Sequence, residues 1–214
     1  MSSQARVARA KNSSPAAALA ITAGKVRMRD RIFETACELF YQHGIRAVGV
    51  DAITAGAGTN KTTFYRSFAS KEALVAEYLR EQVRQYFKVW DEAVGQFPKQ
   101  PKKQVEALFE RFLRPNDGPR CQYERGCALG NAAVEIAEED AELERIIAEY
   151  KAEIRARFRK LARDAGARDP GVLGDTLMLL MEGGAATRLT FSDRTGPAAS
   201  IVKAVRALMA AHAA

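Results

Sequence analysis

Five side chains between positions 61 and 66 carry groups that could bind a nucleic acid: Lys61, Thr62, Thr63, Tyr65 and Arg66. Hydroxyl and guanidinium groups can bond either base edges or phosphate oxygens, so they could read a sequence or hold a backbone. The start of a helix also attracts anions, because its first backbone N–H groups have no partner within the helix. These residue types therefore predict a short helix that contacts DNA.

Two short helices separated by a tight turn are predicted to position these side chains. Val50, Ile53 and Ala57 are spaced by three and four residues, which places them on one apolar face of a first helix. Gly58 then allows a sharp reversal, because glycine tolerates backbone angles that other residues avoid. This spacing is also typical of a helical hairpin with a solvated polar face, so that alternative stays open at this point.

The second short helix is predicted to run from Lys61 to Phe68. Asn60 can cap it, because its side chain accepts hydrogen bonds from the free backbone donors of the first turn. Phe64 and Phe68 lie four residues apart and anchor the helix inward. The polar side chains of the same segment are then left on faces that point outward.

Residues 31–74 resemble the N-terminal domain of the TetR family of bacterial repressors. The matching positions, in chain order, are Ala36, Leu39, Phe40, Gly44, Ile53, Gly58, Lys61, Thr63, Tyr65, Phe68, Ser70, Lys71, Glu72 and Leu74. An ordered match of this length favours DNA binding over a solvated hairpin. Val48 and Gly49 stand where the family usually has Thr or Ser, so a hydroxyl contact to phosphate is expected to be missing there.

The resemblance implies a TetR-type transcriptional regulator. We expect a repressor that binds a palindromic operator in double-stranded DNA as a homodimer and that a small-molecule effector releases. The predicted DNA-binding residues are Thr62, Thr63 and Arg66 for base edges, Lys61, Tyr65 and Lys71 for phosphates by their position in the family motif, and Asn60 at the start of the helix. An activator would use the same residues, so activation stays an alternative to repression.

The excess positive charge is concentrated in the N-terminal third of the chain. Residues 1–71 contain 11 Lys or Arg against 4 Asp or Glu, whereas residues 72–214 contain 22 of each, so the net charge of +7 lies in the first part. Such charge strengthens binding to phosphates, because it releases counterions from the DNA. The split indicates that only the first part touches DNA, and a purely structural dimer would not explain it.

Residue types that catalytic, metal or membrane functions require are few. The chain has two histidines and three cysteines, whose spacing predicts no zinc cluster, disulfide framework or His-based triad. It contains no phosphate-binding glycine loop or nucleophile motif of the known enzyme classes, and no apolar run long enough to cross a membrane. We therefore expect a cytoplasmic protein, at the bacterial nucleoid when bound to DNA, with no enzymatic activity, cofactor or metal.

The chain is predicted to be all-α and to fall into three parts. Residues 1–24 are basic, rich in alanine and free of acids, which is typical of a disordered arm, and such an arm can also enter a minor groove. Residues 25–71 are expected to form a three-helix DNA-binding domain with a helix-turn-helix. Residues 72–214 are expected to form a helical domain for effector sensing and dimerisation.

Apolar periodicity and capping residues predict the other helices. Their approximate ranges are 25–43, 70–96, 105–113, 127–137, 140–165, 170–191 and from 197 onward. Residues 177–181 are apolar on every side, so they should be covered by the core on one side and by a partner subunit on the other. We expect the last two helices to form a four-helix dimer interface with their symmetry mates.

The effector is expected to bind among apolar side chains of the second domain, with a few polar groups to orient it. The predicted ligand-binding residues are Phe87, Trp90, Phe109, Phe112, Cys127, Asn131, Glu135, Met178, Met181 and Arg188. Aromatic and Met side chains at helical spacing are also typical of ordinary core, so this interpretation stays open. Residues 125–135 resemble a G-C-x-x-G-N-x-x-x-E pattern found in one branch of TetR-type repressors, which does not identify the ligand.

Cys127 offers an alternative mode of sensing. It precedes a predicted helix and follows Arg125, and this setting favours the reactive thiolate. Cys121 lies six residues earlier and could resolve a sulfenic acid formed there. The alternative function is thus a repressor that responds to electrophiles or oxidants through Cys127, and a buried, inert thiol is the other possibility.

Overall fold

The computed structural model describes residues 27–113, 126–136, 140–187, 190–191 and 196–213. These residues form helices and no strand, which confirms the all-α prediction. The helices are α2 (Met28–His43), α3 (Val50–Gly56), α4 (Lys61–Ser67), α5 (Lys71–Gly95), α6 (Pro101–Leu113), α7 (Ala128–Glu135), α8 (Ala141–Asp164), α9 (Pro170–Thr187), the 3-10 turn η2 (Pro197–Ser200) and α10 (Ile201–Ala211). The predicted arm, residues 1–24, lies outside the described residues.

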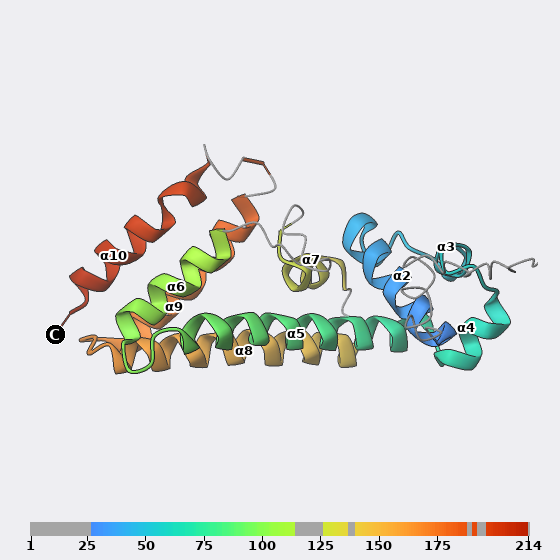
Figure 1. Cartoon of the computed structure of the whole chain (residues 1–214), viewed down its shortest axis with the longest axis horizontal. Helices are drawn as coiled ribbons and strands as arrows, with labels where there is room; N and C mark the ends of the chain where they lie inside the picture. Colours follow the sequence, from blue (N-terminus) through green and yellow to red (C-terminus); the bar gives the residue numbers. More distant parts are fainter. Residues whose placement is uncertain (1–26, 114–125, 137–139, 188–189, 192–195, 214) are drawn as a thin grey trace, which may run out of the picture.

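The helices form a small head and a longer body (Figure 1). The head consists of α2, α3 and α4, which gather at one end of the long helix α5. The body consists of α6 to α10, in which α8 runs alongside α5 and α9 packs extensively on α8. Helix α7 packs on α5 between the head and the rest of the body, where it can contact both.

The head folds around the apolar residues that its sequence periodicity predicts. Ile32 and Phe40 of α2, Ile53 of α3 and Phe64 of α4 are all buried and belong to one hydrophobic core. Gly44 follows α2 with φ of +88°, a backbone angle that side-chain-bearing residues rarely adopt. The apolar faces and this glycine together explain why three short helices close on one another here.

Helix α5 belongs to the head and to the body. Its first turn is capped by Ser70, whose Oγ accepts a hydrogen bond of 3.1 Å from the Ala73 N–H. Leu74 and Tyr78 are buried against the head, and Trp90 is buried in the body. Because the buried residues of both parts form one continuous cluster, the direction in which α5 points sets where the head lies.

Several helix boundaries differ from the sequence predictions. Helix α2 begins at Met28 rather than at position 25, because the backbone of Arg27 is extended, with φ of −61° and ψ of 143°. Helix α6 begins already at Pro101, where proline is tolerated because the first N–H of a helix has no acceptor. The described part of helix α9 ends at Thr187, and residues 188 and 189 lie outside the described residues, so the predicted end near position 191 stays a prediction. The last segment opens with the 3-10 turn η2 before α10.

Gly174 allows α8 and α9 to pack closely. A Cβ atom on Gly174 would lie 2.6 Å from the Arg159 Cα and 2.7 Å from the Arg159 backbone N. Next to it, Asp175 accepts hydrogen bonds from the Nε of Arg155 at 2.9 Å and of Arg159 at 2.8 Å. These hydrogen bonds from two guanidinium groups hold the pKa of the Asp175 carboxyl well below its usual range.

We expect Gly174→Ala to lower the free energy of unfolding by about 1–3 kcal/mol, because the added methyl group meets backbone atoms that cannot rotate away. Chemical denaturation measures the loss. Gly95→Ala is the matched control, since a Cβ atom there meets nothing within 4 Å. Equal losses in the two variants would contradict the close approach of α8 and α9.

Candidate functional site

Helix α4 is the element that carries most of the candidate DNA-binding residues. Asn60 precedes it with an extended backbone, and its Oδ1 accepts a hydrogen bond of 2.9 Å from the Thr63 N–H. Phe64 is fully buried and Phe68 nearly so, and the centroids of their rings lie 5.9 Å apart. The cap fixes where α4 begins and the two rings fix which of its faces is buried.

The outward face of α4 carries two of the predicted base-contacting side chains and one predicted phosphate-contacting side chain. Thr62, Tyr65 and Arg66 are exposed and are spaced by three and four residues, so they share one side of the helix. Tyr65 keeps 55% of its surface exposed, a large fraction for an aromatic residue. Asn60 and Lys61 are also exposed, whereas Thr63 and Lys71 are half-buried. The seven predicted residues therefore lie on or directly beside one short helix, with Thr63 and Lys71 less accessible than the others.

Two cations of the head have acidic partners that the sequence did not reveal. Lys61 pairs with Asp51 of α3 through an Nζ–Oδ1 distance of 2.9 Å, and this hydrogen bond raises the pKa of the Lys61 ammonium. Arg29 donates two hydrogen bonds to Glu77 of α5, 48 residues away, and its guanidinium lies 4.5 Å from the Phe68 ring centroid. Arg29 at the start of α2 thus joins the head to α5.

The aromatic residues of the predicted pocket pack against rings of α8. Trp90 packs edge-on against Phe158 with 4.7 Å between ring centroids, and the fully buried Phe109 lies 6.1 Å from the same ring. The Phe87 ring lies 5.9 Å from that of Tyr150. These contacts are typical of core packing, and effector binding by Phe87, Trp90 and Phe109 stays a prediction.

The other predicted ligand-binding residues are scattered. Met181 is buried in the core and Met178 is half-buried against it. Arg188 and the side chain of Phe112 lie outside the described residues. Asn131 and Glu135 lie on α7, where they line a groove toward the head instead of joining the aromatic residues of the body.

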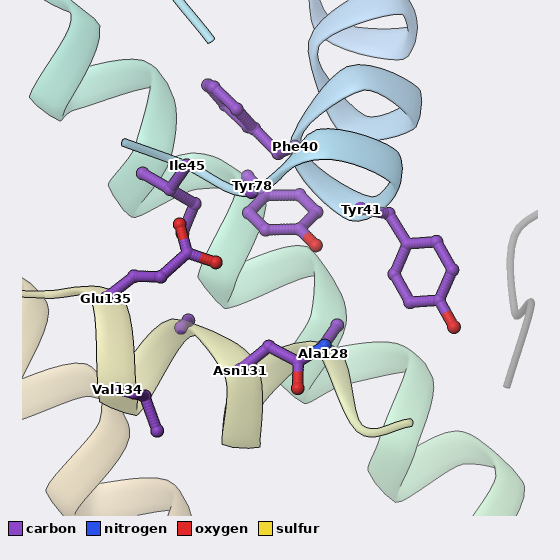
Figure 2. A pocket seen from close by; sticks show the side chains of 10 residues that line it. Phe40, Tyr41, Ile45, Tyr78, Ala128, Asn131, Val134 and Glu135 are labelled. Carbon is purple, nitrogen blue, oxygen red and sulfur yellow. The ribbon is translucent and has the colours of Figure 1, made fainter. Parts of the chain in front are cut away.

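This junction groove lies between α7 and the head and has a volume of about 250 Å³ (Figure 2). The residues that line it are Phe40, Tyr41, Gly44, Ile45, Tyr78, Ala128, Asn131, Ala132, Val134 and Glu135. Figure 2 shows the Tyr41 and Tyr78 rings on the side of α2 and α5, and Asn131 and Glu135 on the side of α7. Burial raises the pKa of the Tyr78 hydroxyl, with nearby groups including Glu135 adding to the effect, so Tyr78 is neutral at neutral pH.

Helix α7 is attached to the head near both of its ends. At its start, the Tyr41 hydroxyl donates to the Gly126 carbonyl at 3.4 Å. At its end, Oε2 of Glu135 accepts a hydrogen bond of 3.0 Å from the Arg46 backbone N–H, 89 residues away in sequence. A Cβ atom on Gly44 would lie 2.8 and 2.9 Å from the two carboxylate oxygens, so the carboxylate occupies space that only glycine leaves open.

Cys127 takes part in the structure at the start of α7. Its Sγ accepts a hydrogen bond of 3.4 Å from the Gly130 N–H and lies 3.8 Å from the Tyr150 hydroxyl. The thiol thus caps α7 and contacts α8. Cys121 lies outside the described residues, so sensing by Cys127 stays a prediction.

A second groove, of about 650 Å³, lies at the far end of α5 from the head. Trp90 is the predicted ligand-binding residue among those that line it. Two of the three cations that line it have acidic partners, since Arg157 bonds Asp91 and Glu153, and Lys160 pairs with Asp164. These pairs offset much of the charge in the groove, and Lys99 is the third cation that lines it.

In the described part of the chain, no cluster of three or more His, Cys, Asp or Glu side chains is arranged to hold a metal ion. No described helix combines the length and apolar character that crossing a bilayer requires.

Comparisons with known proteins identify the head and the whole architecture. The family model of bacterial regulatory proteins of the tetR family matches residues 32–78. The HTH-type transcriptional repressor DhaR of Mycobacterium sp. (strain GP1) is 26% identical over 110 residues, which are 51% of this chain and 52% of DhaR. The chain thus spans about half the length of the curated relatives it matches, or less.

Solved structures extend the similarity over most of the chain. A TetR-family transcriptional regulator from Streptomyces coelicolor superposes with a TM-score of 0.78 and 27% identity, covering 87% of this chain and 96% of that one. A regulator from Saccharomonospora viridis, solved in complex with choline, gives a TM-score of 0.69 at 19% identity, covers 85% of this chain and 95% of that one, and shows the shared fold.

We expect Asn60→Ala to lower the free energy of unfolding by about 1 kcal/mol, because the Thr63 N–H loses its acceptor. Asn60→Ser is the matched control, since a serine hydroxyl at the same position can accept that hydrogen bond. Denaturant melts of the three proteins measure the difference. A serine variant as unstable as the alanine variant would argue against the cap.

Proposed function

Because the chain belongs to the TetR family of transcriptional regulators, we propose that it is a repressor that binds a palindromic operator as a homodimer and is released by a small-molecule effector. One observation carries the proposal: capped helix α4 turns Thr62, Tyr65 and Arg66 outward on one side. In the proposed domain organisation, residues 25–71 bind DNA, and residues 72–214 sense the effector and form the dimer.

The side chains of α4 have different tasks in the proposed complex. Thr62, Thr63 and Arg66 contact base edges in the major groove, and a guanidinium can bond the two acceptors of guanine at once. Lys61, Tyr65 and Lys71 contact phosphates and set the register of the helix in the groove. Asn60 acts indirectly, because its cap holds the first turn of α4 in place.

A homodimer is proposed from the apolar face that α9 leaves uncovered. Leu177 and Met181 are buried in the core of the chain, whereas Leu179, between them, keeps 72% of its surface exposed. Val172, seven residues before Leu179 and so on the same side of α9, keeps 52% of its surface exposed, and exposed apolar residues that share one helix face are typical of a subunit interface. Pairing of α9 and α10 with their symmetry mates would place two heads on half-sites about 34 Å apart, one turn of the DNA helix.

Release by an effector is proposed from the way the body holds the head. Helix α7 bonds the head through Glu135 and through Gly126, so a change in the body that moves α7 also moves the head. An effector lowers DNA affinity only if it binds more tightly to the conformation that fits DNA poorly. The choline complex of the Saccharomonospora viridis regulator supports a small organic effector for a protein of this fold.

To find the operator, genomic DNA fragments of the source organism are incubated with the purified protein near physiological salt. The fragments that the protein retains are then recovered and sequenced. We expect one palindromic sequence to be enriched. Arg66→Ala should weaken binding to it by about 5- to 150-fold, the value of one good base contact. Arg163→Ala, an exposed arginine of α8 in the body, is the control and should bind as the wild type does. Recovery of fragments without a common motif would refute sequence-specific reading.

We expect Leu179→Lys to convert the dimer to a monomer, because an ammonium would be buried between two apolar surfaces. Sedimentation velocity at micromolar concentration measures the change, and operator affinity should fall with it. Leu179→Met keeps an apolar side chain of similar volume and should remain dimeric. A lysine variant that still sediments as a dimer would place the interface elsewhere.

A further inference from the structure

The junction groove contains a carboxylate without a described cationic partner. Glu135 carries the only charge among the ten residues that line the groove, and its side chain is half-buried. Within the part of the chain that the structure describes, its hydrogen-bond donor is the neutral N–H of Arg46, and no lysine or arginine side chain pairs with it. A carboxylate that is partly removed from water favours a positive charge beside it, and none of the described residues supplies one to Glu135.

Two further features of the groove favour a cation. The opposite wall carries the rings of Tyr41 and Tyr78, and an aromatic ring attracts a cation through the negative charge on its face (Figure 2). Glu135 is also the last residue of α7, and the carbonyl groups at the end of a helix carry partial negative charge. A volume of about 250 Å³ suits a small molecule with one apolar portion.

We propose that the junction groove binds a small organic cation, an ammonium compound with an apolar portion, whose charge pairs with the Glu135 carboxylate between α7 and the head. The proposal rests on the proposed function and specifies the chemical class and the place of the effector. The ammonium group competes with the Arg46 N–H for the carboxylate and draws Glu135 away from the head. One of the two hydrogen bonds from α7 to the head is then lost.

This site couples occupancy to the position of the head through the space beside Gly44. The carboxylate fits against the Gly44 backbone, where any Cβ atom would collide with it. When the carboxylate turns toward a cation in the groove, α7 and the loop after α2 are no longer joined there. The cation therefore favours conformations in which the head has moved relative to α5, and DNA affinity falls.

Three probes of matched shape and different charge test the site: 2-phenylethylammonium, the neutral 2-phenylethanol and the anionic 3-phenylpropionate. Isothermal titration calorimetry on the full-length protein measures their binding. We expect the ammonium to bind at least about tenfold more tightly than the other two, because only it can pair with Glu135. Equal binding of all three probes, or binding of none, would overturn the proposal.

Glu135→Gln is the decisive variant, because it removes the charge and keeps an oxygen that can accept the Arg46 N–H. Ammonium binding should weaken by about tenfold or more in this variant, while its thermal melting stays close to that of the wild type. Ala133→Ser, at an exposed position of α7 that does not line the groove, is the control and should bind the ammonium nearly as the wild type does. Unchanged ammonium binding by Glu135→Gln would overturn the role of the carboxylate.

A separate titration of operator DNA distinguishes this inference from the proposed function. The ammonium should lower the operator affinity of the wild type and have a much smaller effect on Glu135→Gln. Ammonium binding that leaves operator affinity unchanged would overturn the coupling, although operator binding itself would stand. If no operator is found, the proposed function fails, and calorimetry with the three probes still decides whether the groove binds cations.

Discussion

The head and the body share one hydrophobic core, and the rest of the structure depends on this continuity. Helix α5 buries Leu74 and Tyr78 at its head end and Trp90 in the body. Separating the head or the body from its half of α5 would expose apolar surface. This exposure costs roughly 1.5–3 kcal/mol for each large side chain. The two parts therefore change their relation by tilting α5 or by repacking its neighbours, and not by hinging at a loose linker.

Polar contacts then determine which of the permitted orientations is held. Arg29 and Glu77 tie the start of α2 to α5, while Glu135 and Tyr41 tie the other end of α2 to α7. Each contact is exposed or only partly buried, so each contributes far less than the core does. Weak contacts of this kind suit regulation, because binding of one small ligand supplies enough free energy to break them and form others.

Helix capping and apolar periodicity, which involve only residues close in sequence, were sufficient to predict much of the fold. Asn60 caps α4 as predicted, and Ser70 and Asp140 cap α5 and α8 in the same way, because a cap depends on groups only two or three residues away. Contacts across the fold were beyond these rules: no pattern in the sequence indicates that Glu135 meets Arg46, 89 residues away. The aromatic stripes are a related case. Periodicity shows which face of a helix is buried, but it does not show which rings of α8 pack against that face.

The ion pair between Lys61 and Asp51 gives the head an internal counterion. Lys61 lies at the start of α4, where a phosphate of the bound DNA is expected, yet its charge is already balanced by a carboxylate of α3. When a phosphate replaces Asp51 as the partner of Lys61, a counterion leaves the DNA. The Asp51 carboxylate, now without Lys61, gathers a counterion of its own, which partly offsets that release. The salt dependence of binding should therefore be shallower than a count of the cations on the head suggests. If Lys61 contacts a phosphate as proposed, the head would lose less DNA affinity as cellular ionic strength rises, and the specificity of the protein would depend correspondingly more on base contacts.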